Sequence, residues 1–264
     1  MTIHVSKRFL DRAKPQLRRY QKILEAAKTR DVNESDTVVI VSDFLADVLG
    51  YDKYSEVTTE FAIRSTFCDL AIKVGNQICF LIEVKSIGTD LRENHLRQAV
   101  DYGAKQGTEW VVLTNGITWQ AHRIRFEQPV ESDEVFCIDL LAPTSTSRDL
   151  LGRLYLLSRE SLASSDIAKY WAHKEATNRF VLAQLMLSDR VLNHLRREVR
   201  RLSKGVKTTA AEVGELLRTE VLKREVLEGE RAEHAETLVR RAARRRIRAA
   251  SEPEPGGKPA PPPA

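Results

Sequence analysis

The sequence predicts an α/β fold, in which a mixed β-sheet flanked by helices is followed by an all-α C-terminal region. Two observations carry this prediction. Before residue 145, short apolar runs rich in branched side chains are separated by Gly and Asn turns, which is typical of strands. Residues 147–249 contain no proline and no strand-like run, but long stretches rich in Leu, Arg and Glu that are typical of helices.

Composition places the chain among globular proteins. Its 264 residues are 42% hydrophobic and 30% charged, with a net charge of +5 that is compatible with a polyanionic partner. Three cysteines lie scattered without C-x-x-C spacing, which indicates reduced thiols and a cytoplasmic location. No run of about 18 apolar residues is present, so no membrane span is expected. Met1 to Arg19 also lacks the apolar segment of a secretory signal.

The first two elements are expected to be helices. Residues 5–30 have a basic amphipathic pattern that predicts one helix, or two helices broken near Pro15. A second helix is expected over 33–50, with Asn33 as its N-cap and Gly50 as its stop.

The strands follow from runs of apolar residues bounded by turn residues. Three strands, one helix and three further strands are expected over 55–63, 67–74, 78–86, 91–106, 110–113, 118–124 and 135–140. The pair Asn115-Gly116 suits a tight turn with a positive φ between the fourth and fifth strands.

Three regions are expected along the chain: an α/β domain over 1–144, a helical and basic region over 145–250, and a Pro- and Ala-rich tail over 251–264 that cannot bury apolar surface and is expected to be disordered. The helical region carries two basic clusters, which are Arg196, Arg197, Arg200, Arg201, Lys204 and Lys207, and Arg240, Arg241, Arg244, Arg245, Arg246 and Arg248. Either cluster could neutralise phosphates. Glutamates are interleaved between the two clusters, so the same pattern is equally compatible with an ordinary charged helix or a coiled coil that binds no nucleic acid.

The candidate chemistry lies on the hairpin formed by the second and third expected strands. Side chains alternate along a strand, so Glu83 and Lys85 project to the same face. A three-residue loop, Gly75 to Gln77, sets Asp69 opposite Glu83 and collects the branched apolar side chains on the other face. A two-residue loop would set Asp69 opposite Ile82 instead. We predict the first register, with a cation between the two carboxylates, because like charges facing each other destabilise a bare sheet.

These residue types suit metal-dependent hydrolysis of a phosphodiester bond. Asp69, Glu83 and the carbonyl of Val84 would hold Mg²⁺, with Mn²⁺ as an alternative, and Lys85 would orient or deprotonate the water or stabilise charge on the phosphate. The alternatives without a catalytic role are that Asp69 is an ordinary acid at the start of a strand, and that Glu83 and Lys85 are solvated residues at the end of one. The two functional hypotheses are a metal-dependent endonuclease and a non-catalytic nucleic-acid-binding or assembly module that retains the fold.

The order of elements and several short motifs resemble the PD-(D/E)xK nuclease superfamily, and within it the N-terminal nuclease domain of type I restriction enzyme R proteins. The resemblance covers about residues 15–140 and rests on Asn33-Glu34, Leu49-Gly50-Tyr51, Asp69, Glu83-Val84-Lys85, Gln98-x-x-x-Tyr102 and Trp110 to Gly116. It implies a restriction-endonuclease-like fold and a Mg²⁺-dependent endodeoxyribonuclease of restriction type.

The resemblance also implies roles for individual residues. Asp69 and Glu83 would be metal ligands, Lys85 the catalytic lysine, and Glu34 the first-helix glutamate that faces the site. Where the superfamily motif has a proline before the aspartate, this chain has Cys68.

The resemblance implies DNA as the substrate. Other restriction-system subunits, or self-association through the C-terminal helices, are the further partners considered. Gln98 and Tyr102 are four residues apart and share a helix face, so they could support the site or contact a DNA phosphate, with ordinary helix surface as the alternative. No G-x-x-x-x-G-K-[ST] motif is present, so an ATP-driven motor like that of type I R proteins is not expected in this chain.

Overall fold

The computed structural model describes residues 3–63, 66–142, 147–202, 205 and 207–251. The chain forms two compact units, Met1–Trp171 and Ala172–Ala264, which are described separately. Lys204 of the first basic cluster and all but the first residue of the expected disordered tail lie outside the described residues.

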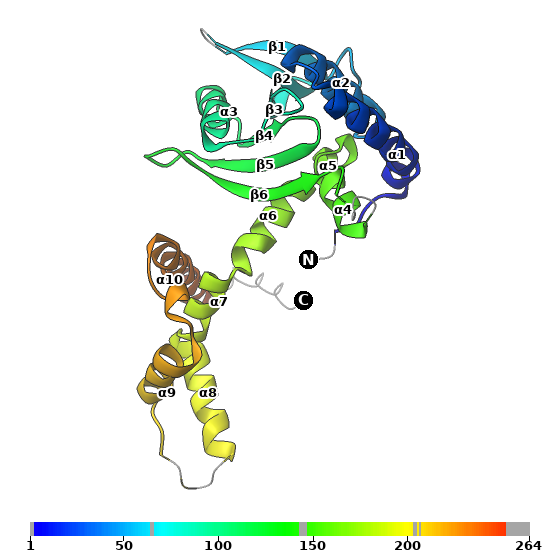
Figure 1. Cartoon of the computed structure of the whole chain (residues 1–264). Coiled ribbons are helices and arrows are strands. Elements are labelled where there is room, and N and C mark those ends of the chain that lie inside the picture. Colours follow the sequence, from blue (N-terminus) through cyan, green and yellow to red (C-terminus); the bar gives the residue numbers. More distant parts are fainter. Residues whose placement is uncertain (1–2, 64–65, 143–146, 203–204, 206, 252–264) are drawn as a thin grey trace, which may run out of the picture. The chain divides into compact units, whose positions relative to one another are not determined.

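The first unit is built on one six-stranded sheet (Figure 1). Its strands lie in chain order: β1 (Val57–Ile63), β2 (Thr66–Val74), β3 (Gln77–Val84), β4 (Trp110–Thr114), β5 (Thr118–Arg125) and β6 (Glu131–Asp139). β3 and β4 are parallel, and the other neighbouring pairs are antiparallel. The predicted mixed sheet is therefore confirmed.

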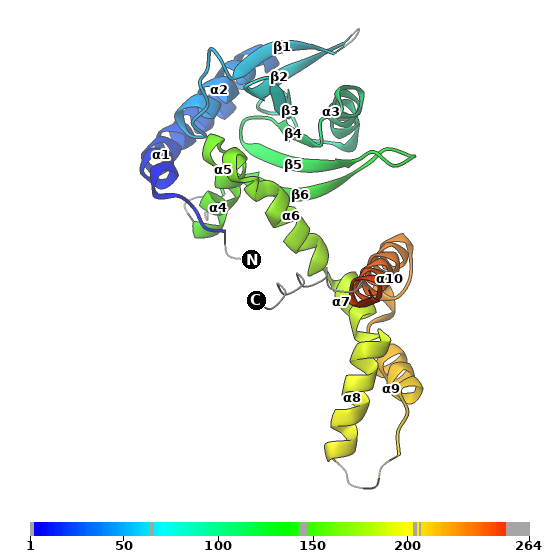
Figure 2. The ribbon, with the colours of Figure 1, turned by 180° about the vertical axis from the view of Figure 1, so that it is seen from behind.

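Helices cover both faces of this sheet. They are α1 (Lys7–Arg30), α2 (Glu34–Asp47), α3 (Glu93–Gln106), α4 (Arg148–Leu156), α5 (Arg159–Ser164) and α6 (Asp166–Ala176). Phe80 and Ile82 of β3 belong to the core shared with α1, α2 and α4, whereas Leu81 between them belongs to the core beneath α3. Because strand side chains alternate, the two cores lie on opposite faces of the sheet. The view from behind shows α1 and α2 on one side of the strands and α3 on the other (Figure 2).

The first helix is continuous, which decides between the two alternatives left open by the sequence. Pro15 lies inside α1, where its ring is exposed to solvent. The buried stripe continues on both sides of it, through Ala13 and Leu17, so packing holds the two parts of α1 together across the proline.

A close approach fixes α3 against the sheet. A Cβ at Gly103 would collide with Cδ1 of Ile124 and lie 2.8 Å from Cγ1 of Val111, so glycine allows this spacing without displacing either side chain. α3 begins nine residues after β3 ends at Val84, and its position therefore determines the path of the loop that leaves the candidate site.

The second unit contains α7 (Arg179–Met186), α8 (Asp189–Leu202), α9 (Ala210–Leu216), a π-helix (Leu217–Val221), a 3₁₀-helix (Arg224–Val226) and α10 (Glu230–Ser251). Leu187, Leu192, Val213 and Leu217 form a small core. The predicted all-α C-terminal region is confirmed, although α4, α5 and most of α6 belong to the first unit. The domain boundary near residue 145 stays a prediction. Among the described residues, no helix combines the length and apolarity needed to cross a membrane.

Candidate metal and catalytic site

The β2–β3 hairpin brings Asp69 and Glu83 together, but by a different route from the expected one. The turn is the two-residue loop Gly75-Asn76, with Val74 paired to Gln77, so the predicted three-residue loop is wrong. A β-bulge at Cys79 then shifts the register by one residue. Beyond the bulge, Ile72 pairs with Phe80 and Leu70 with Ile82, as predicted. The next position of this register sets Asp69 beside Glu83.

The backbone of β3 holds Asp69 in place. Its Oδ2 accepts a hydrogen bond of 2.7 Å from the backbone N–H of Val84, the residue between the Glu and the Lys of the motif. Asp69 is half-buried, and burial raises the pKa of its carboxyl group above the usual value, against the lowering effects of this hydrogen bond and of Lys85.

Glu83 is the most deeply buried member of the set, with an exposed fraction of 1%. Its Oε1 accepts a hydrogen bond of 2.6 Å from Nζ of Lys85. Its Oε2 is also buried and has no hydrogen-bond partner within the described part of the chain. Burial raises the pKa of Glu83 to about 7, and the charge of Asp69 adds to this effect while Lys85 opposes it.

Lys85 lies between two carboxylates. Besides its contact with Glu83, its Nζ lies 3.7 Å from Oε2 of Glu34, at the start of α2. Burial lowers the pKa of Lys85, but the hydrogen bond and charge of Glu83, with the charge of Glu34, outweigh it and raise the pKa above the usual value. The ammonium form is therefore the stable one at neutral pH.

Asp69 and Glu83 are the carboxylates that could hold a divalent cation. Among the residues that the structure describes, no group of three or more His, Cys, Asp and Glu side chains is arranged to hold a metal ion. Two carboxylates, however, are adjacent and desolvated. An unpaired buried carboxylate oxygen is costly, and Oε2 of Glu83 is such an atom within the described chain. A hard cation would satisfy this oxygen, and its remaining positions would be filled by backbone oxygen or water.

Cys68 stands where the resemblance would place a proline. Its buried thiol lies 3.4 Å from the carbonyl oxygen of Ile82 and 3.5 Å from that of Leu70. Burial, together with the charges of Glu83 and Asp69, raises the pKa of this thiol to about 12. Cys68 is therefore a neutral packing residue beneath α3 rather than a nucleophile.

Gln98 and Tyr102 meet as their spacing predicts, since Nε2 of Gln98 donates a hydrogen bond of 2.9 Å to the hydroxyl of Tyr102. Tyr102 is buried in the core beneath α3, whereas Gln98 is exposed. This arrangement stiffens the helix face. The proposed support or DNA contact by the pair stays a prediction.

Two features near the site were not predicted as parts of it, although Asn115 was predicted as a turn residue. Glu60 of β1 lies opposite Asp69 in the β1–β2 register, and its φ of 47° is a strained value for a side-chain-bearing residue. Asn115 closes the turn after β4: its Oδ1 accepts from the N–H groups of Ile117 and Thr118, and its Nδ2 donates to the carbonyl of Thr89 at 2.9 Å. This last bond ties the loop after Lys85 to the predicted Asn-Gly turn, whose Gly116 has a φ of 83°.

A cavity of about 350 Å³ lies in that loop and is lined by Gly88, Thr89, Asp90, Arg92, Asn94 and His95. The capping contact of α3 closes one side of it, because Nδ1 of His95 accepts from the backbone N–H of Arg92. None of these residues was predicted from the sequence as part of a site.

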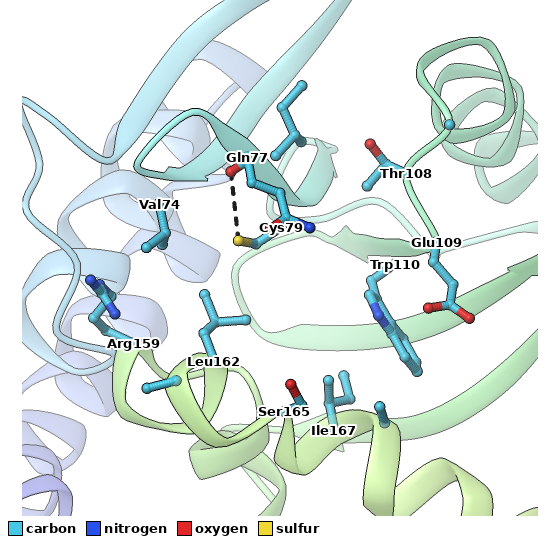
Figure 3. Close-up of a pocket in the computed structure, with 14 residues that line it drawn as sticks. Val74, Gln77, Cys79, Thr108, Glu109, Trp110, Arg159, Leu162, Ser165 and Ile167 are labelled. Carbon is cyan, nitrogen blue, oxygen red and sulfur yellow. Dashed lines mark hydrogen bonds between the residues drawn. The ribbon is translucent and has the colours of Figure 1, made fainter.

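A larger cavity of about 500 Å³ lies at the other end of the central strands (Figure 3). Gln77 begins β3 and Trp110 begins β4, whereas Glu83 lies near the end of β3. The charged side chains that line it already have partners, since Arg159 lies 2.6 Å from Glu56 and Glu109 lies 2.5 Å from Arg123. None of the predicted site residues lines this cavity, and we assign no chemistry to it.

Comparison with known proteins supports the expected resemblance for the first unit. No curated protein and no solved structure matches the chain. Residues 39–134, which run from α2 into β6 and include Asp69, Glu83 and Lys85, match the family model described as the type I restriction enzyme R protein N terminus (HSDR_N), so this part of the chain resembles a restriction-related nuclease module.

Proposed function

We propose that the first unit is a metal-dependent endonuclease of restriction type that hydrolyses phosphodiester bonds of DNA, with Asp69, Glu83 and Lys85 at its centre. The observation that carries this proposal is the unpaired oxygen of the buried Glu83 beside a second desolvated carboxylate. The family match of residues 39–134 supports the restriction-type reading.

In this proposal Asp69, Glu83 and the carbonyl oxygen of Val84 hold Mg²⁺, or Mn²⁺ in its place. The bound cation would supply a Lewis acid for the phosphate and lower the pKa of a bound water. Hydrolysis forms a bond from the water oxygen to phosphorus and breaks one P–O ester bond, and the leaving oxygen ends protonated. The chain's part is to hold carboxylates and ammonium in fixed positions around these atoms.

The raised pKa of Lys85 argues against one of its three candidate roles, that of general base. A general base must give up its proton at working pH, whereas Lys85 holds its proton tightly beside Glu83. We therefore assign it to stabilising negative charge on the phosphate and to orienting the water. Glu34, 3.7 Å from Nζ, would keep the ammonium directed towards the site.

The alternative is a non-catalytic module that binds nucleic acid or restriction-system subunits. Plasmid cleavage with and without Mg²⁺ separates the two, with Lys85→Ala beside the wild type. Lys73→Ala is the matched control, because Lys73 lies in β2 with its ammonium over the ring of Phe61, 4.3 Å from the centroid. We expect cleavage by wild type and Lys73→Ala only, and only with Mg²⁺. DNA binding without cleavage by the wild type would favour the non-catalytic module.

A further inference from the structure

Formal charge is divided unequally between the two units. Residues 1–171, which carry the candidate site, contain 22 Lys and Arg against 24 Asp and Glu, a formal charge of −2. Residues 172–264 contain 20 against 13, a formal charge of +7. A unit of net negative charge is repelled by a phosphate backbone at long range. We therefore expect the long-range attraction of the chain to nucleic acid to come mainly from the second unit.

Four of the seven arginines of α10 share one side of that helix. At about 100° per residue, Arg240, Arg241, Arg244 and Arg245 fall within an arc of about 140°, and all four are exposed. We call these four residues the α10 arginine face. The buried positions Ala232 and Ala235, each 1% exposed, fall on the opposite side of the helix. The buried side of α10 therefore packs within the second unit, where α7 is its neighbour, and the four arginines face solvent on the other side.

Among the described residues, no carboxylate forms an ion pair with the α10 arginine face. Elsewhere in this unit arginines do pair with carboxylates: Arg179 lies 3.0 Å from Glu225, Arg201 lies 2.6 Å from Glu198, and Arg224 lies 2.6 Å from Glu228. Within the described residues, no ion pair involves the four arginines of the face. Four adjacent, unpaired guanidinium groups repel one another, so a structural role alone does not explain them.

We propose that the α10 arginine face is a docking surface for the phosphate backbone of duplex DNA and anchors the substrate of the first unit. Arginine suits this partner, since its planar donors bind phosphate in pairs and its charge does not titrate. α8 adds two exposed arginines, Arg190 and Arg197, on its side away from the buried Leu192. The contacts would be independent of base sequence, so they would give affinity rather than site choice. This inference rests on the proposed function for its choice of DNA as the polyanion.

The test is the salt dependence of DNA binding, measured in EDTA with the full chain and a fluorescent duplex that cannot be cleaved under these conditions. The variant replaces Arg240, Arg241, Arg244 and Arg245 with Gln. The matched control replaces four exposed basic residues of α1, Lys14, Arg18, Lys22 and Lys28, with Gln and removes the same charge from the first unit. Each lost phosphate contact should lower the log–log slope by about 0.9, so the variant should lose up to about 3.6 units.

The expected result is a flattened slope for the α10 variant and a nearly unchanged slope for the α1 control. An unchanged slope in the α10 variant, or an equal loss in the control, would overturn the proposal. Binding of the wild type to anionic vesicles but not to DNA would also overturn it. So would a change in the sedimentation coefficient of the α10 variant that accounts for its flattened slope. Because no cleavage is measured, an inactive nuclease centre would leave this test intact, and cleavage by the variant at low salt would leave the proposed function intact.

Discussion

Nζ of Lys85 lies 2.6 Å from Oε1 of Glu83 and leaves Oε2 of the same carboxylate buried without a partner in the described chain. The ion pair therefore satisfies only one of the two oxygens of the buried Glu83 carboxylate. Such an arrangement is unfavourable for the metal-free fold and favourable for cation binding.

Glu83→Gln should abolish Mg²⁺-dependent cleavage and yet stabilise the metal-free protein at pH 8. Burial raises the pKa of Glu83 from 4.5 to about 7, so between these values the folded protein binds more protons than the unfolded chain. Stability should therefore fall as pH rises from about 4.5 to about 7, with the full penalty present above 7. Denaturant unfolding in EDTA should show a gain of about 1–3 kcal/mol for Glu83→Gln at pH 8 and little gain at pH 4.5.

Glu93→Gln is the control for this measurement. Glu93 also pairs with a basic residue, Arg97, at 2.7 Å, but its side chain is 76% exposed. Its substitution should change stability little at either pH. If Glu83→Gln proved no more stable than the wild type at pH 8, the carboxylate would not be desolvated as the structure indicates.

Asp69→Asn should separate cation binding from folding. The amide oxygen can still accept the hydrogen bond from the Val84 N–H, so the β2–β3 contact is kept. The loss of one negative charge should weaken Mn²⁺ binding by at least tenfold and remove cleavage. Calorimetric titration with Mn²⁺ measures the first effect, with Asp101→Asn on the exposed side of α3 as control. Equal Mn²⁺ affinity for Asp69→Asn and the wild type would exclude Asp69 as a ligand.

The strained backbone at Glu60 predicts an unusual response to glycine. Its φ of 47° is disfavoured for residues with a Cβ. Glu60→Gly should therefore raise stability by up to about 1 kcal/mol, whereas Thr59→Gly, at the neighbouring exposed position of β1, should lower it by about 0.5–1 kcal/mol. Thermal unfolding of both variants gives the comparison. A loss of stability in both would show that Glu60 is not strained.

Glu60 also lies opposite Asp69, and its charge raises the pKa of that carboxyl group. If this carboxylate contributes to cation binding, Glu60→Gln should weaken Mn²⁺ affinity, and Glu60→Gly should weaken it equally despite its greater stability.

The sequence predicted the sheet and the pairing of Asp69 with Glu83 because the apolar alternation on both strands allows a single register near the site. It could not predict how the hairpin reaches that register. The two-residue turn alone would have sent the acids to opposite faces, and the bulge at Cys79 corrects this with one extra residue. A bulge leaves no mark in a run of apolar residues, since the pattern on either side of it stays alternating.

Other parts of the site depend on contacts between residues distant in sequence. The hydrogen bond from Asn115 to Thr89 joins residues that are 26 positions apart, and no pattern in either segment predicts that they meet. Pro15 shows the converse case, in which a local signal for a break is overridden because both halves of α1 are packed on the same core.

Asn115→Asp tests whether the loop after Lys85 must be tied down for cleavage. The aspartate keeps an oxygen that can accept from Ile117 and Thr118, but it has no N–H to donate to the Thr89 carbonyl. Asn115 is buried, so the aspartate would also place a carboxylate oxygen against the carbonyl oxygen of Thr89. We expect this to lower the free energy of unfolding by about 1–3 kcal/mol. Asn76→Asp, in the exposed β2–β3 turn, is the control and should be neutral.

For Asn115→Asp we expect a folded protein with kcat lowered and with DNA binding in EDTA unchanged, because the loop would lie next to the reacting phosphate rather than on the α10 arginine face. Cleavage is compared at a temperature where both variants remain folded, as checked by circular dichroism. Undiminished cleavage by Asn115→Asp, despite its lower stability, would show that the tether serves the fold alone and that the loop has no part in positioning the substrate.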